Sequence, residues 1–208
     1  MQYQAIFFDF DGVILDSVHV KTEAFAAMFR PYGPDIEKAV VDYHLANGGV
    51  SRFKKFEYYY TQLLNKPIDQ ETLDALGHEF NRLVLGKVLE SSFIPGAMET
   101  LEKLKKNAVP AFVASGTPDE EIKLIVEKKG LSSYFLEVHG SPRKKDQIIS
   151  DIAGRYNFDL PGCLFIGDAM TDYEAAFKCG TKFLGITKQK DQSPFPEGTR
   201  VMQHLDLQ

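Results

Sequence analysis

Two aspartates stand one residue apart at the end of an apolar run, in the segment FFDFDGVILDS at residues 7–17. Side chains alternate along a strand, so Asp9 and Asp11 can face the same side where the strand ends. A carboxylate can attack phosphorus and form an aspartyl-phosphate, which divides one difficult step into two easier ones. Two carboxylates and a phosphate repel one another, so this chemistry predicts a hard divalent cation, Mg2+, between them.

Further reactive side chains follow the other apolar runs, each at the end of a predicted strand. In an open α/β sheet, ligands bind beyond the carboxyl ends of the strands, so these side chains are expected at one edge of one sheet. Together they supply a hydroxyl, a cation and an acidic pair. They are Ser115-Gly116-Thr117 after the run 110–114, Arg143-Lys144-Lys145 after the run 134–138, and Asp168 with Asp172 after the run 163–166.

Phosphoryl transfer explains the types of these residues. Asp168 is placed to complete the ligands of the metal, and Asp172 lies one helical turn further on as a direct or an indirect partner. Ser115 and the backbone N–H of Gly116 can hydrogen-bond phosphoryl oxygens, because they precede a helix predicted over 118–129.

A phosphoester reaction also needs a positive charge and a proton donor. Lys145 is preferred for the charge because its spacing to the following isoleucines suits the start of a helix, and Lys144 is the alternative. Asp11 fits the general acid that protonates the departing alcohol and the base that activates water, provided that its surroundings raise its pKa.

The elements that hold these residues alternate between strand and helix after residue 94. Such alternation predicts an α/β fold, in which a parallel sheet is covered by helices on both faces. Thr117 and Glu120 are expected to form a capping box at the start of the helix 118–129. Strands are predicted over 3–8, 110–114, 134–138, 163–166 and 182–186, and further helices over 95–107 and 144–156.

Residues 18–92 contain no predicted strand. Their apolar periodicity indicates about four helices, separated by the turn signals PYGP, NGG and NKP. An all-helical insert of this length predicts a second, smaller domain over 17–92, with the α/β domain formed by 1–16 and 93–208. The helices are predicted over 18–30, 35–46, 51–65 and 69–89.

The composition narrows the classes of function. The chain has 208 residues, and its hydrophobic content of 44% is enough for a sizeable core. The formal net charge of -5 makes a general nucleic-acid surface unexpected. No signal peptide and no apolar stretch of membrane-spanning length is recognised, so a cytoplasmic protein without membrane contacts is expected.

The motifs DFDGV, SGT, a downstream lysine and GDAMTD resemble the four motifs of the haloacid dehalogenase (HAD) superfamily. The helical insert resembles the α-helical cap of that superfamily, in its phosphoglycolate phosphatase and β-phosphoglucomutase-like subfamily. The resemblance implies a Rossmann-like core, and it implies Mg2+ held by Asp9, the Asp11 carbonyl and Asp168. It also implies Asp9 as nucleophile, Asp11 as general acid/base, a phosphate-binding Ser115 and an orienting lysine.

The second aspartate distinguishes reactions within this superfamily. The dehalogenases for which it is named lack that aspartate and the metal, because a halide leaves without a proton. Asp11 therefore favours phosphoryl transfer. Asp16 and Ser17 are expected to lead into the cap rather than to join the reaction centre.

The segment GGVSRFKKF at 48–56 resembles the cap loop of β-phosphoglucomutase-like members, in which an arginine contacts the second phosphate of the substrate. Arg52 matches that position, at a helix start where Ser51 is the candidate N-cap. Lys54 and Lys55 can add positive charge. Lys21 stands where such mutases carry a histidine, and a surface position on the first cap helix is expected for it.

The sequence thus predicts a Mg2+-dependent phosphatase for a small phosphorylated metabolite that carries a second anionic group. Two alternatives remain open: a β-phosphoglucomutase-like sugar phosphomutase, and a non-catalytic binding protein on the same fold. Nothing in the sequence indicates the oligomeric state.

Overall fold

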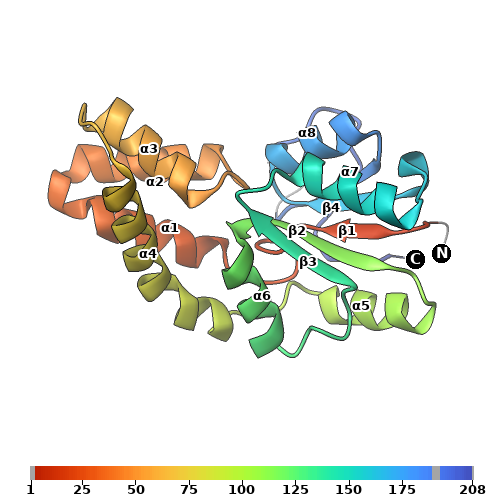
Figure 1. Cartoon of the computed structure of the whole chain (residues 1–208). Coiled ribbons are helices and arrows are strands. Elements are labelled where there is room, and N and C mark those ends of the chain that lie inside the picture. The colour runs from red at the N-terminus through yellow and green to blue at the C-terminus, as the bar shows by residue number, and fades with distance from the viewer. Residues whose placement is uncertain (1–2, 189–192, 208) are drawn as a thin grey trace.

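Six parallel strands form one sheet in the computed structural model, which describes residues 3–188 and 193–207. The order across the sheet is β3-β2-β1-β4-β5-β6, so β1 lies between β2 and β4 (Figure 1). The strands are β1 (Ile6–Phe8), β2 (Ala111–Pro118), β3 (Glu137–Ser141), β4 (Leu164–Gly167), β5 (Lys182–Ile186) and β6 (Val201–Met202).

The central strand β1 is buried on both faces, which is typical of a parallel sheet covered by helices. Phe8 is paired with Val113 of β2 and with Ile166 of β4. The regular pairing of the three strands therefore ends at one level. This register places Asp9, directly after β1, beside the carboxyl ends of both neighbours.

Helices cover both faces of the sheet, with α7 and α8 on one face and α5 and α6 on the other (Figure 1). Because side chains alternate along a strand, Phe7 packs with the isoleucines of α7, whereas Ile6 and Phe8 pack with apolar residues of α5 and α6. The predicted α/β fold is confirmed. These helices are α5 (Ala97–Lys106), α6 (Asp119–Lys128), α7 (Lys145–Tyr156) and α8 (Met170–Cys179).

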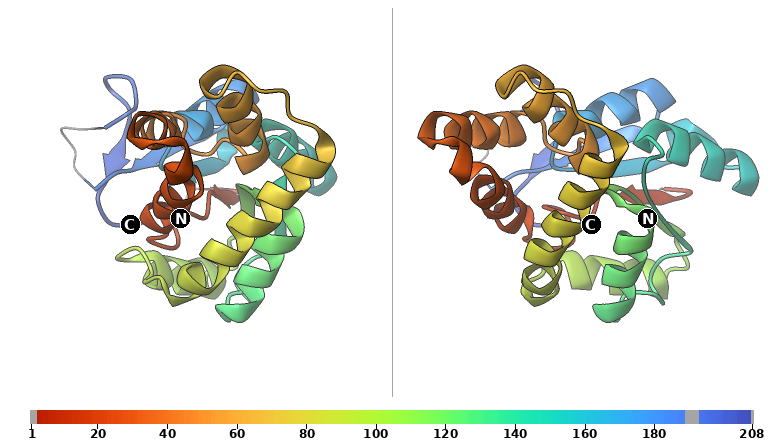
Figure 2. Two further views of the ribbon diagram at one scale, coloured as in Figure 1. Left: turned by 90° about the vertical axis from the view of Figure 1, so that its left-hand side faces the viewer. Right: turned by 60° about the vertical axis from the view of Figure 1, so that its left-hand side comes forward.

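Residues 18–90 form helices that lie beside the sheet (Figure 1), and Figure 2 turns them toward the viewer. Aromatic rings fill their centre: the ring of Phe25 lies 4.4 Å from that of Phe80 and 5.6 Å from that of Tyr59. The helices are α1 (Val18–Phe29), α2 (Pro34–Ala46), α3 (Arg52–Tyr58), which continues as a π-helical turn (Tyr59–Leu63), and α4 (Gln70–Glu90).

The two segments that connect these helices to the sheet lie side by side. The backbone N–H of Asp16 donates to the carbonyl of Ser92 at 2.9 Å, and that of Ile94 donates to the carbonyl of Ile14 at 2.9 Å. The chain therefore leaves and re-enters the α/β part at one place. The domain limits at 16/17 and 92/93 stay a prediction, and these bonds lie beside both of them.

The end of β2 differs from the expectation. The strand continues through Ser115-Gly116-Thr117 to Pro118, with an irregular register, and α6 begins only at Asp119. The predicted capping box is therefore wrong: Thr117 is part of the strand, and Glu120 is almost fully exposed. Asp119 accepts a hydrogen bond from the backbone N–H of Gly140 instead, which ties α6 to β3.

The start of β3 also differs from the expectation. The run 134–138 was expected to be a strand, but its pairing with β2 begins only at Glu137, and the ring of Phe135 just before it lies 6.0 Å from the ring of Phe8. An apolar run of this length does not distinguish a buried turn from a strand. The short edge strand β6 was not predicted. Among the helices described, none is long and apolar enough to cross a membrane.

Candidate active site

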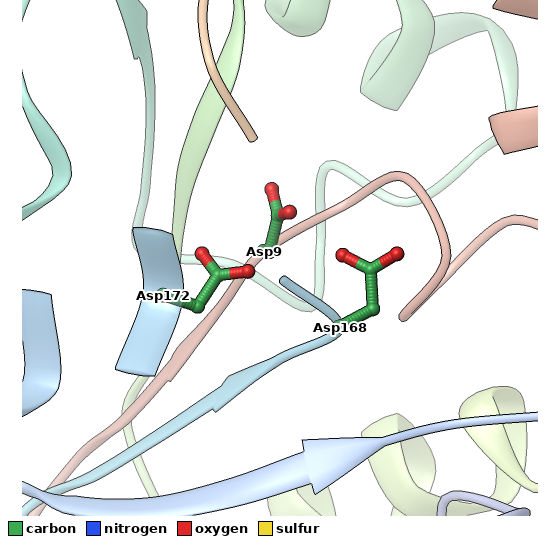
Figure 3. Close-up of side chains that lie close together, drawn as sticks. All are labelled: Asp9, Asp168 and Asp172. Atoms are coloured by element: carbon green, nitrogen blue, oxygen red, sulfur yellow. The ribbon is translucent and has the colours of Figure 1, made fainter. Parts of the chain in front are cut away.

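Three carboxylates meet at the carboxyl edge of the sheet (Figure 3). Asp9 follows β1, Asp168 follows β4, and Asp172 lies in the first turn of α8. One oxygen atom from each lies within 4.8 Å of the others. Asp9 and Asp172 are buried, and Asp168 is half-buried. The structure thus brings together three of the four predicted metal ligands through their side chains.

The electrostatics of this cluster favour a cation. The pKa of Asp9 is raised to about 7, because burial and the charges of Asp172 and Asp11 outweigh the lowering effect of Lys145. Burial, with the charges of Asp9 and Asp172, likewise holds the pKa of Asp168 well above its usual range. Three carboxyl groups therefore share one lysine, and their ionised forms are disfavoured unless a further positive charge is present. A set of oxygen donors with excess negative charge fits a hard divalent cation.

Lys145 is the cation that the structure places in this cluster. Its Nζ atom lies 2.9 Å from Oδ2 of Asp9 and 2.5 Å from Oδ1 of Asp172. Burial alone would lower its pKa, but the two carboxylates raise it, so the ammonium form is favoured. Lys144 is exposed and lies at the N-cap position of α7. Of the two lysines that the sequence offers for the positive charge, the structure places Lys145 in the acidic cluster and Lys144 at the surface.

Asp172 has other partners for both of its carboxylate oxygens. Oδ1 accepts from Lys145, and Oδ2 accepts from the backbone N–H of Ala169 at 3.1 Å. Asp172 therefore positions the lysine and the loop after β4, and its direct binding to a metal stays a prediction.

Asp11 is held as a carboxylate. Its Oδ1 accepts from the hydroxyl of Ser17 at 2.6 Å, and its Oδ2 accepts from the hydroxyl of Thr117 at 3.0 Å and from Nζ of Lys21. Burial raises the pKa of Asp11, but the Lys21 charge and these hydrogen bonds outweigh burial and hold the pKa below its ordinary value. The expectation that the surroundings raise this pKa is wrong for the described structure.

The turn after Asp11 requires a glycine. Gly12 has a φ of +80°, and a Cβ atom there would lie 2.2 Å from Oδ2 of Asp168. A side chain at this position would therefore displace a residue of the acidic cluster.

The contacts of Lys21, Thr117 and Ser17 with Asp11 were not expected. Lys21 of α1 was expected at the surface, yet its side chain is only 14% exposed, and Nζ donates to the Thr117 hydroxyl at 2.7 Å as well as to Asp11. Its match to the mutase histidine was the one signal for this position. Thr117 was expected to cap a helix. Its contact with Asp11 was not expected, because that contact depends on β2 continuing to Pro118.

Ser115 and Gly116 lie where the sequence predicts them, at the strand-end edge. Ser115 is buried, and its hydroxyl accepts from the backbone N–H of Thr117 at 3.1 Å. A Cβ atom on Gly116 would lie 2.4 Å from the carbonyl oxygen of Gly49 in the loop before α3. This loop also accepts a hydrogen bond at Gly48 from the Thr171 hydroxyl, at 2.9 Å. The helical part is therefore packed directly over the site.

Arg52 lies at the first position of α3, but its charge is matched within the protein. Its guanidinium donates to Oε1 of Glu121 in α6 at 2.6 Å and lies 4.5 Å from the centre of the Phe80 ring. Asn81 donates to the other Glu121 oxygen. Ser51 is the N-cap residue but makes no side-chain cap bond. The role of Arg52 in binding a second anion stays a prediction.

A cavity of about 170 Å3 lies between the two parts of the molecule. The α/β part contributes Asp11, Gly116, Thr117 and Asp168 to its wall, and the helical part contributes Lys21, His44, Arg52 and Lys55. A ligand in this cavity would therefore contact the strand-end residues and the helical part at the same time.

Comparison with known proteins places this arrangement in a class. Residues 3–180 match the family model described as haloacid dehalogenase-like hydrolase. The crystal structure of β-phosphoglucomutase from Clostridium difficile shares the fold, with a TM-score of 0.77 at 20% identity over 97% of this chain and 91% of that one. The class is that of hydrolases with a parallel α/β sheet and helices inserted after the first strand. The chain belongs to the haloacid dehalogenase-like hydrolase family.

Sequence relatives in this family are named as phosphatases. Phosphoglycolate phosphatase 1 of Pseudomonas aeruginosa is 25% identical over 198 residues, covering 88% of this chain and 68% of the relative. Phosphoglycolate phosphatase of Photobacterium profundum is 26% identical over 195 residues, covering 88% of this chain and 82% of the relative. The predicted family and hydrolase class are confirmed, and the predicted phosphoric monoester hydrolase agrees with these names.

Proposed function

We propose that this protein is a Mg2+-dependent phosphatase that hydrolyses a small phosphorylated metabolite through an aspartyl-phosphate on Asp9. The observation that carries the proposal is the position of Asp9, which lies 2.9 Å from Nζ of Lys145 and within a cluster of acidic oxygens that suits a metal. The phosphatase names of the sequence relatives support the same reaction.

The chain's own residues divide the reaction into two steps. In the first, an Asp9 oxygen forms a bond to phosphorus, the bond to the ester oxygen breaks, and the departing alcohol takes a proton from Asp11. In the second, water attacks phosphorus, the bond to Asp9 breaks, and Asp11 takes a proton from the water. Lys145 and the Ser115 hydroxyl bind phosphoryl oxygens. Because Lys21 favours ionised Asp11, Asp11 must take up a proton before the first step, which a singly ionised phosphate ester can supply, and the second step uses its resting form.

The residues that would hold Mg2+ are Asp9 and Asp168 through carboxylate oxygens and Asp11 through its carbonyl, with Asp172 as a direct or indirect partner. The ion would neutralise negative charge on the phosphoryl group.

A panel of phosphate esters tests this proposal. Purified protein with Mg2+ is expected to release inorganic phosphate from at least one of an aryl phosphate, 2-phosphoglycolate and common sugar phosphates. Asp9→Asn should abolish release and leave the fold intact, because an amide is a poor nucleophile of similar size. Background rates for the whole panel, or an active Asp9→Asn variant, would refute the proposal.

The same panel tests the phosphomutase alternative, which the β-phosphoglucomutase fold similarity keeps open. With β-glucose 1-phosphate and its bisphosphate activator, a mutase yields an isomeric sugar phosphate, whereas a phosphatase yields inorganic phosphate and the free sugar.

A further inference from the structure

One buried lysine in the cavity wall has no part in the reaction described above. Lys55 of α3 is 2% exposed and lines the cavity between the two parts of the molecule, together with Asp11 and Asp168. A buried ammonium is costly unless it is paired with a negative charge. The partners of Lys55 therefore decide what it can do.

The other cations around the site each have a carboxylate partner, and Lys55 does not. Within residues 3–188 and 193–207, no carboxylate lies within ion-pair distance of Lys55. Its Nζ atom contacts His44 of α2 instead, at 2.8 Å from Nδ1 and 3.3 Å from the backbone carbonyl. The paired cations are Lys21 with Asp11, Arg52 with Glu121, and Lys145 with Asp9 and Asp172.

Lys55 and His44 each have a hydrogen-bond donor without an acceptor among the described residues. An ammonium has three N–H donors, and the contacts with His44 use two of them. Because Nδ1 of His44 accepts from Lys55, the proton of the neutral ring is on Nε2. That Nε2 atom is buried and has no hydrogen-bond partner among the described residues. An unpaired donor on each of two neighbouring side chains calls for an acceptor that the described protein does not supply.

The surrounding charges place this pair close to the reaction centre. The pKa of Lys55 is lowered to about 7 by burial and by the charges of Lys21 and Lys145, against the raising effect of Asp168. Burial and Lys55 lower the pKa of His44 to about 3, so the ring is neutral. An anion beside Lys55 would restore its full charge.

We propose that Lys55, oriented by His44, binds a carboxylate carried by the substrate, at the opposite end of a short molecule from the phosphoryl group. The inference rests on the proposed phosphatase function and names its substrate class. The cavity of about 170 Å3 is smaller than the roughly 300–1,000 Å3 typical of sites for drug-sized ligands, so it suits a molecule of a few carbon atoms. Arg52 also lines the cavity but is paired with Glu121, whereas Lys55 has no carboxylate within ion-pair distance among the described residues.

A matched pair of substrates tests the assignment. 2-Phosphoglycolate and its carboxyl methyl ester share the phosphoryl group and differ in one negative charge. We expect wild-type protein with Mg2+ to prefer the acid by at least about tenfold in kcat/KM. Lys55→Met should bring this ratio toward one by raising KM for the acid, and Lys55→Arg should retain part of it. Lys38→Met, which removes an exposed lysine of α2, should leave the ratio unchanged.

Calorimetric binding of the same two compounds, with Mg2+ present, separates this inference from the proposed function. The acid should bind more tightly than the ester to wild-type protein even if neither is hydrolysed, and Lys55→Met should lose the difference. Equal affinity of wild-type protein for both compounds overturns the assignment. So does an equal loss for both compounds in a Lys55→Met protein whose circular dichroism matches wild type.

Discussion

At the scale of single residues, the acidic cluster shows how a reaction centre conflicts with stability. Asp9 and Asp168 have raised pKa values because they are desolvated beside like charges. Without a cation, this repulsion opposes folding. A bound Mg2+ would reverse the sign of the local charge and stabilise the folded state by mass action.

Thermal unfolding with and without Mg2+ tests this balance. Wild-type protein should have a higher Tm with Mg2+, because the bound ion raises the free energy of unfolding by about 2.7 kcal/mol when the free ion is at a hundred times its Kd. Asp168→Asn should raise the Tm of metal-free protein, since it removes one of the repelling charges, and should reduce the gain from Mg2+. Asp42→Asn, which changes an exposed acid of α2, is the control. A Mg2+ gain in Asp168→Asn equal to that of wild type would contradict the metal site.

At the scale of elements, helix α3 holds the buried Lys55, whose charge destabilises the fold. The pKa of Lys55 is about 7 in the folded protein and about 10.5 in an exposed chain. The unfolded chain therefore binds this proton more tightly. Below about pH 7 the charged Lys55 destabilises the folded protein most. This destabilisation decreases as the pH rises from about 7 toward 10.5.

Lys55→Met should accordingly change stability in a pH-dependent way. The quantity to compare is the free energy of unfolding of the variant minus that of wild type. We expect this difference to be at least about 1 kcal/mol larger at about pH 6.5 than at about pH 9.5. The loss of the His44 contact affects both pH values alike, so the difference between them isolates the lysine charge. Urea titrations measure it, with Lys38→Met as the control. The same difference at both pH values would show that Lys55 has an ordinary pKa.

The elements also show what the sequence could predict. Asp9, Asp168 and Lys145 were located because each follows a strand or starts a helix, and parallel strands bring such positions to one edge. Lys21 and Lys55 could not be placed, since their burial depends on how the helices rotate and pack against the site. The late start of β3 and the extension of β2 were missed because pairing, rather than local pattern, sets strand limits.

At the scale of the whole molecule, a buried ion pair joins the helical part to the sheet part. Arg52 of α3 and Glu121 of α6 are 5% and 7% exposed, and Asn81 of α4 also binds Glu121. Removing one partner of a buried pair leaves the other charge unpaired, which is strongly unfavourable. Separation of the two parts would return that charge to water.

Glu121→Gln should therefore favour a more open molecule. We expect small-angle X-ray scattering to give a larger radius of gyration than for wild type without substrate, and KM to rise for every substrate alike. Glu79→Gln, which breaks an exposed pair within α4, should change neither quantity. An unchanged radius of gyration and KM would show that other contacts hold the two parts together.

The paired connecting segments, Asp16 with Ser92 and Ile14 with Ile94, have a consequence for variation. Because the insert leaves and returns at adjacent points, its length and sequence can change without displacing a strand of the sheet. Under the proposed function, the strand-end residues assigned to the reaction and the helical-part residues that line the cavity therefore lie in separate stretches of chain. Substitutions in the insert can then redirect the protein to a new metabolite while the strand-end carboxylates keep their places.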